Sequence, residues 1–85
     1  MLNQIIKFQF ASEDSDLVKK FSSIIKKDPS VDAVTAKIDS QTTTVNVTVI
    51  GGTKATLNNN VQYMLGACTY TRKQLEATEL ESWSD

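Results

Sequence analysis

The hydrophobic and polar positions of the 85-residue chain alternate along three segments. In residues 2–11 the apolar side chains share one side of an extended backbone and the polar ones the other: Ile6, Phe8 and Phe10 against Lys7 and Gln9. Aromatic and β-branched residues at a period of two are typical of a half-buried strand. Residues 32–39 and 43–50 alternate similarly, and the polar segment 39–42 between them predicts a β-hairpin.

The same alternation assigns the two faces of the predicted hairpin. The inward positions are Val34, Ala36, Ile38, Val45, Val47 and Val49. The outward positions are Thr35, Lys37, Thr44, Asn46 and Thr48. A sheet that binds single-stranded RNA stacks bases on exposed aromatic rings. The outward face has none, so the pattern argues against an RNA-recognition platform.

Two segments repeat apolar residues at helical spacing. Over 14–27 they are Leu17, Val18, Phe21, Ile24 and Ile25, and over 54–69 they are Leu57, Val61, Met64, Leu65 and Cys68. Ser12 or Asp14 is expected to cap the first helix and Thr53 the second. Asp28-Pro29 should end the first helix, because the residue before proline disfavours the α region.

The C-terminal segment is ambiguous from its pattern. Thr71 to Gln74 has the spacing of a capping box, which favours a third helix over about 72–82. Its apolar residues, Leu75, Leu80 and Trp83, form no tight stripe. The segment could instead continue the preceding helix or fray.

The predicted order is therefore β-α-β-β-α, with a further helix at the end. The two amphipathic helices must cover the apolar sheet face, which predicts a two-layer α+β sandwich in one domain of residues 1–85. A right-handed crossover followed by the hairpin gives the strand order 2-3-1. This topology resembles the ferredoxin-like fold without its fourth strand. Residues 2–11 would then be an edge strand with unpaired backbone groups.

Composition and charge narrow the chemistry. The chain is 40% apolar and 22% charged, with a net charge of -1, no histidine and one cysteine. It therefore lacks the usual general base, the usual zinc ligand and a disulfide pair. We expect Cys68 to be a small buried hydrophobe. No cofactor or metal is predicted, and the N-terminus does not resemble a signal peptide, so a cytoplasmic location is expected.

Two sequence features could suggest catalysis, but both favour a structural interpretation. Gly51-Gly52-Thr53-Lys54 lacks P-loop spacing and is interpreted as a tight turn in which glycine tolerates positive φ. Acyl-phosphate hydrolysis would need an arginine after the first strand, where residues 12–16 carry acids instead. The chain is therefore not expected to be an enzyme.

The remaining hypotheses concern binding. The first is a protein-interaction module, such as a regulator, inhibitor or assembly factor of the kind found among phage accessory proteins. The candidate interface residues are Ile5, Lys7 and Gln9 of the first strand and Tyr63, Tyr70, Leu80 and Trp83 of the C-terminal part. A second copy could pair with the first strand to form a homodimer. Alternatively, the C-terminal helix could cover this edge, or the edge stays solvated in a monomer. Trp83 either folds back onto the core or anchors a partner.

The alternative hypothesis is nucleic-acid binding. It uses a lysine band opposite the apolar stripe of the first helix, formed by Lys19, Lys20, Lys26 and Lys27, with Lys54, Arg72 and Lys73 as further cations. Neighbouring acids at Glu13, Asp14 and Asp16 weaken that field, and a solvated helix face explains the band equally well.

Overall fold

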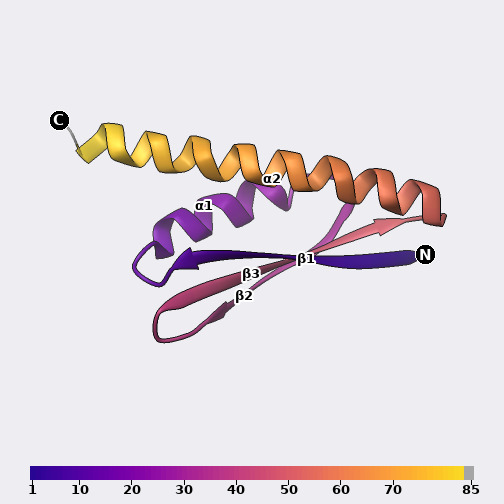
Figure 1. The fold of residues 1–85 in the computed structure, drawn as a ribbon, viewed down its shortest axis with the longest axis horizontal. Helices are drawn as coiled ribbons and strands as arrows, with labels where there is room; N and C mark the ends of the chain where they lie inside the picture. The colour runs from indigo at the N-terminus through magenta and orange to yellow at the C-terminus, as the bar shows by residue number, and fades with distance from the viewer. Residues whose placement is uncertain (84–85) are drawn as a thin grey trace.

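The computed structural model describes the backbone of residues 1–83 and the side chains of residues 1–75. Its elements are, in chain order, β1 (Leu2–Ala11), α1 (Ser15–Ile25), β2 (Val31–Ile38), β3 (Thr42–Gly51) and α2 (Lys54–Trp83). The strands form one antiparallel sheet in the order β1-β3-β2, and both helices lie on the same face of it (Figure 1). This confirms the predicted α+β fold and strand order, with β1 at an edge.

An aromatic cluster joins the first helix to the first strand. Phe21 of α1 is fully buried, and its ring centroid lies 5.7 Å from that of Phe8 and 5.2 Å from that of Phe10. The tilted and edge-on geometries are those that aromatic quadrupoles favour. The cluster lies at the end of β1 that leads into α1, and it fixes that helix on the sheet.

The central strand supplies the most deeply buried aliphatic side chains. Val45, Val47 and Val49 have no exposed surface, and Thr43 continues the same row. The predicted inward positions of β3 are therefore confirmed. From α2, Val61, Met64 and Cys68 pack onto this row within the core.

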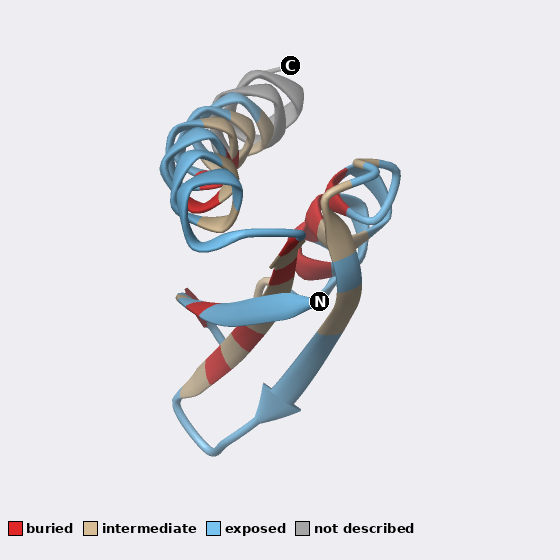
Figure 2. Cartoon of the chain, turned by 90° about the vertical axis from the view of Figure 1, so that its right-hand side faces the viewer, coloured by how far each residue is buried: buried red, intermediate tan, exposed pale blue. Residues whose placement is uncertain are grey.

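The predicted face of β2 is confirmed, but the far end of the strand is not buried. Ala36 is exposed, and Ile38 keeps 76% of its surface in contact with solvent. Both share the helix side of the sheet, but α1 is about 16 Å long and β3 about 33 Å, so this helix cannot cover the whole hairpin. Figure 2 shows the end of β2 exposed and away from both helices. Ile24 and Leu65, at the margins of their helical stripes, are also exposed.

The first helix is shorter than predicted, spanning 15–25 rather than 14–27. Asp14 occupies the N-cap position, but neither of the expected side-chain caps forms. The Asp14 amide instead donates to the Ala11 carbonyl, at 3.0 Å, in a tight turn. The Ser12 hydroxyl donates to the Ser40 carbonyl at the hairpin turn.

The end of α1 is set by Asp28. The Lys27 and Asp28 amides donate to carbonyls three residues back, so the helix tightens and stops. The Asp28 carboxylate then accepts bonds from both the Ser30 amide, at 2.9 Å, and the Ser30 hydroxyl, at 2.7 Å. The predicted stop before Pro29 is thus reinforced by a side-chain turn.

The start of α2 confirms one prediction and corrects another. Thr53 caps the helix, because its hydroxyl accepts a bond from the Thr56 amide at 3.2 Å. Gly51 and Gly52 do not adopt positive φ, so the prediction that the two glycines form a turn with positive φ is wrong. At Gly51 a Cβ atom would lie 2.5 Å from the Leu57 Cα, whereas at Gly52 it would meet nothing. Gly51 is therefore needed for the close approach of α2 to the sheet.

The prediction of a separate third helix over 72–82 is also wrong. Residues 54–83 form one continuous helix, the alternative that its pattern left open. At about 45 Å it is longer than the two longest strands, β1 and β3, at about 33 Å. Its C-terminal turns project past the sheet (Figure 1). Over the described residues, no helix has the length and apolar character needed to span a membrane.

Candidate functional site

The outer edge of β1 presents backbone groups that β3 does not use. In an antiparallel ladder, successive residues direct their amide and carbonyl to opposite sides of the strand. Ile50 of β3 donates its amide to the Ser30 carbonyl on the β2 side, so the odd-numbered residues of β3 face β1. The register pairs these with even-numbered residues of β1. The odd-numbered residues Asn3, Ile5, Lys7 and Gln9 therefore direct their amides and carbonyls outward.

This edge has only part of the protection that natural sheets use. Edge strands are usually shortened, bulged, interrupted by proline or lined with charged side chains, lysine above all, and of these devices β1 has Lys7. β1 is 10 residues long, contains no proline and keeps an unbroken register with β3. The opposite edge, β2, has a register irregularity between Val31 and Ala33. Of the two edges, β1 is the better template for another strand.

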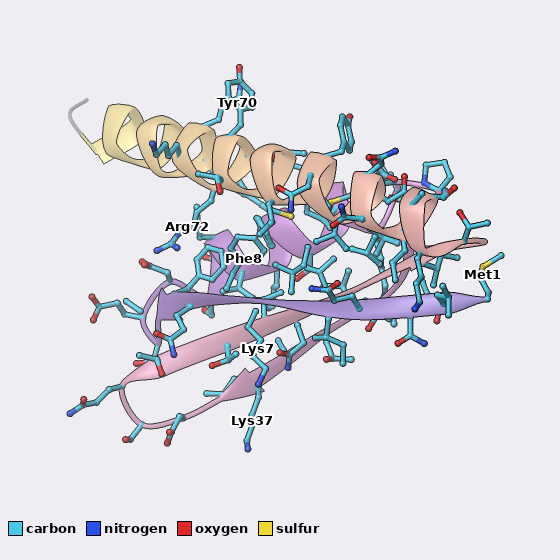
Figure 3. All side chains as sticks on the ribbon, turned by 45° about the vertical axis from the view of Figure 1, so that its right-hand side comes forward. Met1, Lys7, Phe8, Lys37, Tyr70 and Arg72 are labelled. Carbon is cyan, nitrogen blue, oxygen red and sulfur yellow. The ribbon has the colours of Figure 1, made fainter. Side chains whose placement is uncertain are left out.

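The predicted interface residues of β1 lie together on the helix-free face of the sheet. Ile5 is 54% exposed, and Lys7 and Gln9 are exposed beside it. Figure 3 shows Lys7 and Lys37 pointing away from the helices on the same side. The odd-numbered positions of β1 thus combine outward backbone groups with accessible side chains.

Asn46 occupies the middle of this helix-free face. It pairs with Lys7 on one side and with Thr35 on the other. Its side-chain Oδ1 atom is buried and accepts no hydrogen bond from the described residues. An unsatisfied carbonyl of this kind costs about 1–3 kcal/mol.

Phe8 and α2 form a small cavity on the other face of β1. Its volume is about 250 Å³, and its lining residues are Phe8, Thr69, Arg72 and Lys73. The Arg72 guanidinium carbon lies 4.8 Å from the ring centroid of Phe10 in a cation–π contact. Figure 3 shows Arg72 reaching from α2 toward β1, beside Phe8. The sequence identifies both cations, but their position beside β1 depends on how α2 packs on the sheet.

The exposed tyrosines lie elsewhere. Tyr63 and Tyr70 are 66% and 67% exposed. They are roughly opposite Arg72 around the helix, at about 100° per residue, and Tyr70 points away from the sheet (Figure 3). The structure does not bring them together with the β1 residues. Leu80 and Trp83, the other predicted interface residues, lie beyond the residues whose side chains the structure describes.

The lysines of the nucleic-acid alternative are all exposed, but they do not form one regular helical band. Lys19 and Lys20 lie within α1, whereas Lys26 is its C-cap and Lys27 follows in the turn. Asp16 lies in the first turn of the same helix. The band therefore runs from the helix into the turn that follows it.

Cys68 is a buried thiol in the core. Burial of the thiol, and to a lesser extent the nearby Asp28 carboxylate, raises the pKa of Cys68 from its ordinary value of 9.0 to about 11. The thiol therefore stays protonated at neutral pH and is a poor nucleophile. Among the described residues, no three histidine, cysteine, aspartate or glutamate side chains are grouped in a way that could hold a metal ion.

Comparison of the chain with models of known families, with curated proteins and with solved structures finds no match.

Proposed function

We propose that this chain is a non-catalytic, cytoplasmic protein-interaction module, acting as a regulator, inhibitor or assembly factor. It binds by adding a strand from its partner to the outer edge of β1. The observation that carries this proposal is the long, regular outer edge of β1, where Asn3, Ile5, Lys7 and Gln9 direct amides and carbonyls outward. Main-chain hydrogen bonds supply affinity in this mode of recognition, and side-chain pockets supply specificity.

The projecting end of α2 provides a second contact region. This part of the helix carries Leu80 and Trp83 and extends past the sheet in Figure 1. Trp83 is the sole tryptophan of the chain. Its fluorescence therefore reports directly whether a partner reaches this segment.

A proline substitution tests the edge without breaking the sheet. Ile5→Pro removes an outward amide and leaves the β1–β3 hydrogen bonds intact, because proline is tolerated at an edge. Ala36→Pro is the matched control, since the Ala36 amide points outward from the opposite edge, β2. We expect a partner captured from the source cells by the wild type to be captured by Ala36→Pro and lost by Ile5→Pro. Equal capture by Ile5→Pro would contradict the proposal.

The homodimer predicted from the sequence would use the same edge. A second copy would continue the sheet across a two-fold axis through β1. Sedimentation of the wild type and of Ile5→Pro measures this directly. A dimer that persists in Ile5→Pro does not use the β1 edge.

A further inference from the structure

Two lysines lie on the helix-free face of the sheet, one on each edge strand. Lys7 of β1 and Lys37 of β2 are exposed and point away from the helices (Figure 3). The register places them on either side of β3, opposite Asn46 and Thr44 respectively. Among the paired positions of the three strands, all within the described residues, this face carries no aspartate or glutamate. The face is therefore cationic.

Lys7 has no carboxylate of its own chain beside it. Its side chain makes no hydrogen bond or ion pair with the residues that the structure describes. About 14 Å of extended strand separates it from Ala11, the last residue of β1. The acids of this part of the chain lie farther on or on the opposite edge: Glu13 in the turn before α1, Asp39 in the hairpin turn, and Asp32 at the irregularity of β2. A counter-charge for Lys7 must come from a partner.

The geometry of the edge places Lys7 next to any added strand. Residues opposite each other on paired strands have Cβ atoms about 4.5–5.5 Å apart and project from the same face. The residue of an added strand opposite Lys7 therefore projects to the helix-free face, within reach of the ammonium group. Charged residues such as Arg72, Lys73 and Glu76 belong to α2, which covers the other face, and do not enter this contact.

We propose that Lys7 and Ile5 select the partner strand, which carries an aspartate or glutamate opposite Lys7 and an apolar residue opposite Ile5. Ile5 is 54% exposed on the same face, two positions from Lys7, and an apolar residue opposite it covers that surface. The two selected residues lie two positions apart in the partner, whichever way its strand runs. This inference rests on the proposed function and adds the specificity that the backbone edge lacks.

The first strand of a second copy does not meet this requirement. Residues 1–11 contain no aspartate or glutamate, so no register of β1 against β1 places a carboxylate opposite Lys7. In the two-fold register centred on Lys7, two ammonium groups lie directly opposite each other, which is unfavourable. Lys7 thus combines attraction of an acidic partner with repulsion of its own copy, the two means by which interfaces become specific.

The test uses the full chain and a displayed library of random linear peptides of twelve residues. The peptides kept are those that bind the wild type and Ala36→Pro but not Ile5→Pro, which removes peptides that bind elsewhere. We expect them to share an acidic residue at one fixed position and an apolar residue two positions from it. Synthetic peptides then carry glutamate, glutamine or lysine at the acidic position, and the Kd of each is measured.

Charge exchange locates the contact. Glutamine in place of glutamate should weaken binding to the wild type about threefold, as for an exposed cross-strand ion pair, and lysine about tenfold, because like charges then lie opposite each other. Lys7→Glu should reverse this order and prefer the lysine peptide. Lys37→Glu makes the same change in charge on the same face at the other edge, so this control should keep the wild-type order. Added salt should reduce both preferences by screening.

The outcomes separate the two proposals. If the selected peptides show no acidic preference, or if Lys7→Glu and Lys37→Glu alter the preference equally, the inference is wrong and the β1-edge function stands. If no peptide distinguishes the wild type from Ile5→Pro, the edge accepts no added strand and both are wrong. If the wild type forms a dimer that Ile5→Pro abolishes, a second copy occupies the edge despite Lys7, and the inference fails while the edge remains in use.

Discussion

Adding one methyl group at Gly51 should displace the start of α2 from the sheet. The new Cβ would lie 2.5 Å from both the Cα and the amide nitrogen of Leu57. Carbon atoms in contact prefer about 3.5–4.0 Å, so the first turn of α2 must move by about 1 Å. That movement also stretches the bond, 3.0 Å long, from the Asn60 side chain to the Ile50 carbonyl.

These two effects set the expected magnitude. Overpacking of this kind costs about 1–3 kcal/mol, and a lost hydrogen bond adds about 1 kcal/mol. We therefore expect Gly51→Ala to lower the free energy of unfolding by about 2–4 kcal/mol. For a domain of this size, that corresponds to a fall in Tm of roughly 10–25 °C.

Urea unfolding followed by circular dichroism is the appropriate assay, with Gly52→Ala as the matched control. A Cβ at Gly52 meets nothing within 4 Å, and its φ is not positive, so this variant should be neutral or slightly stabilised. If the two variants unfold at the same urea concentration, the close approach at Gly51 does not exist and the reasoning is refuted.

Three further predictions concern other parts of the molecule. Between pH 9 and 11 the wild type should lose stability relative to Cys68→Ala by about 1 kcal/mol per pH unit, because the folded state keeps the Cys68 thiol protonated while the unfolded chain releases the proton. If the unfolding free energies of the two proteins in urea change equally with pH, the raised pKa is contradicted. Asn46→Thr should raise the unfolding free energy by about 1 kcal/mol, since it removes a buried carbonyl without a partner and introduces a better strand former; a lower urea midpoint would show that Asn46 is satisfied. Ile38→Thr should lower Tm by only a few degrees, because Ile38 is 76% exposed, whereas Val47→Thr at a fully buried position should lower the free energy of unfolding by about 1–3 kcal/mol. An equal fall in Tm for the two variants would contradict this burial assignment.

The sequence predicts best those parts of the fold that depend only on neighbouring residues in the chain. The alternation in β1 and β3 depends on the pleat of the strand itself, and the structure confirms it at Phe10 and Val47. The exposure of Ile38 could not be predicted, because it depends on how far α1 extends over the hairpin. The pattern left the continuity of α2 open, because the capping-box spacing at Thr71 favours a new helix, whereas residues 67–83 contain no glycine or proline that would end the preceding one.

The candidate site was likewise predicted only in part from the sequence. The edge position of β1 followed from the predicted strand order, and exposure of Ile5 and Lys7 followed from their parity. The cavity required tertiary information, since Phe8 and Arg72 are distant in sequence and meet only because α2 runs above β1. The sequence shows only that Arg72 and Lys73 are adjacent on a helix that also carries Glu76, Glu79 and Glu81.

The two-residue period of β1 separates stability from recognition. Even-numbered positions such as Ile6 and Phe10 are buried in the core and bond to β3, whereas odd-numbered positions such as Ile5 and Gln9 do neither. Selection on binding can therefore change every second residue of this strand at little cost to folding. A strand built in this way can acquire a new partner while the rest of the molecule stays the same.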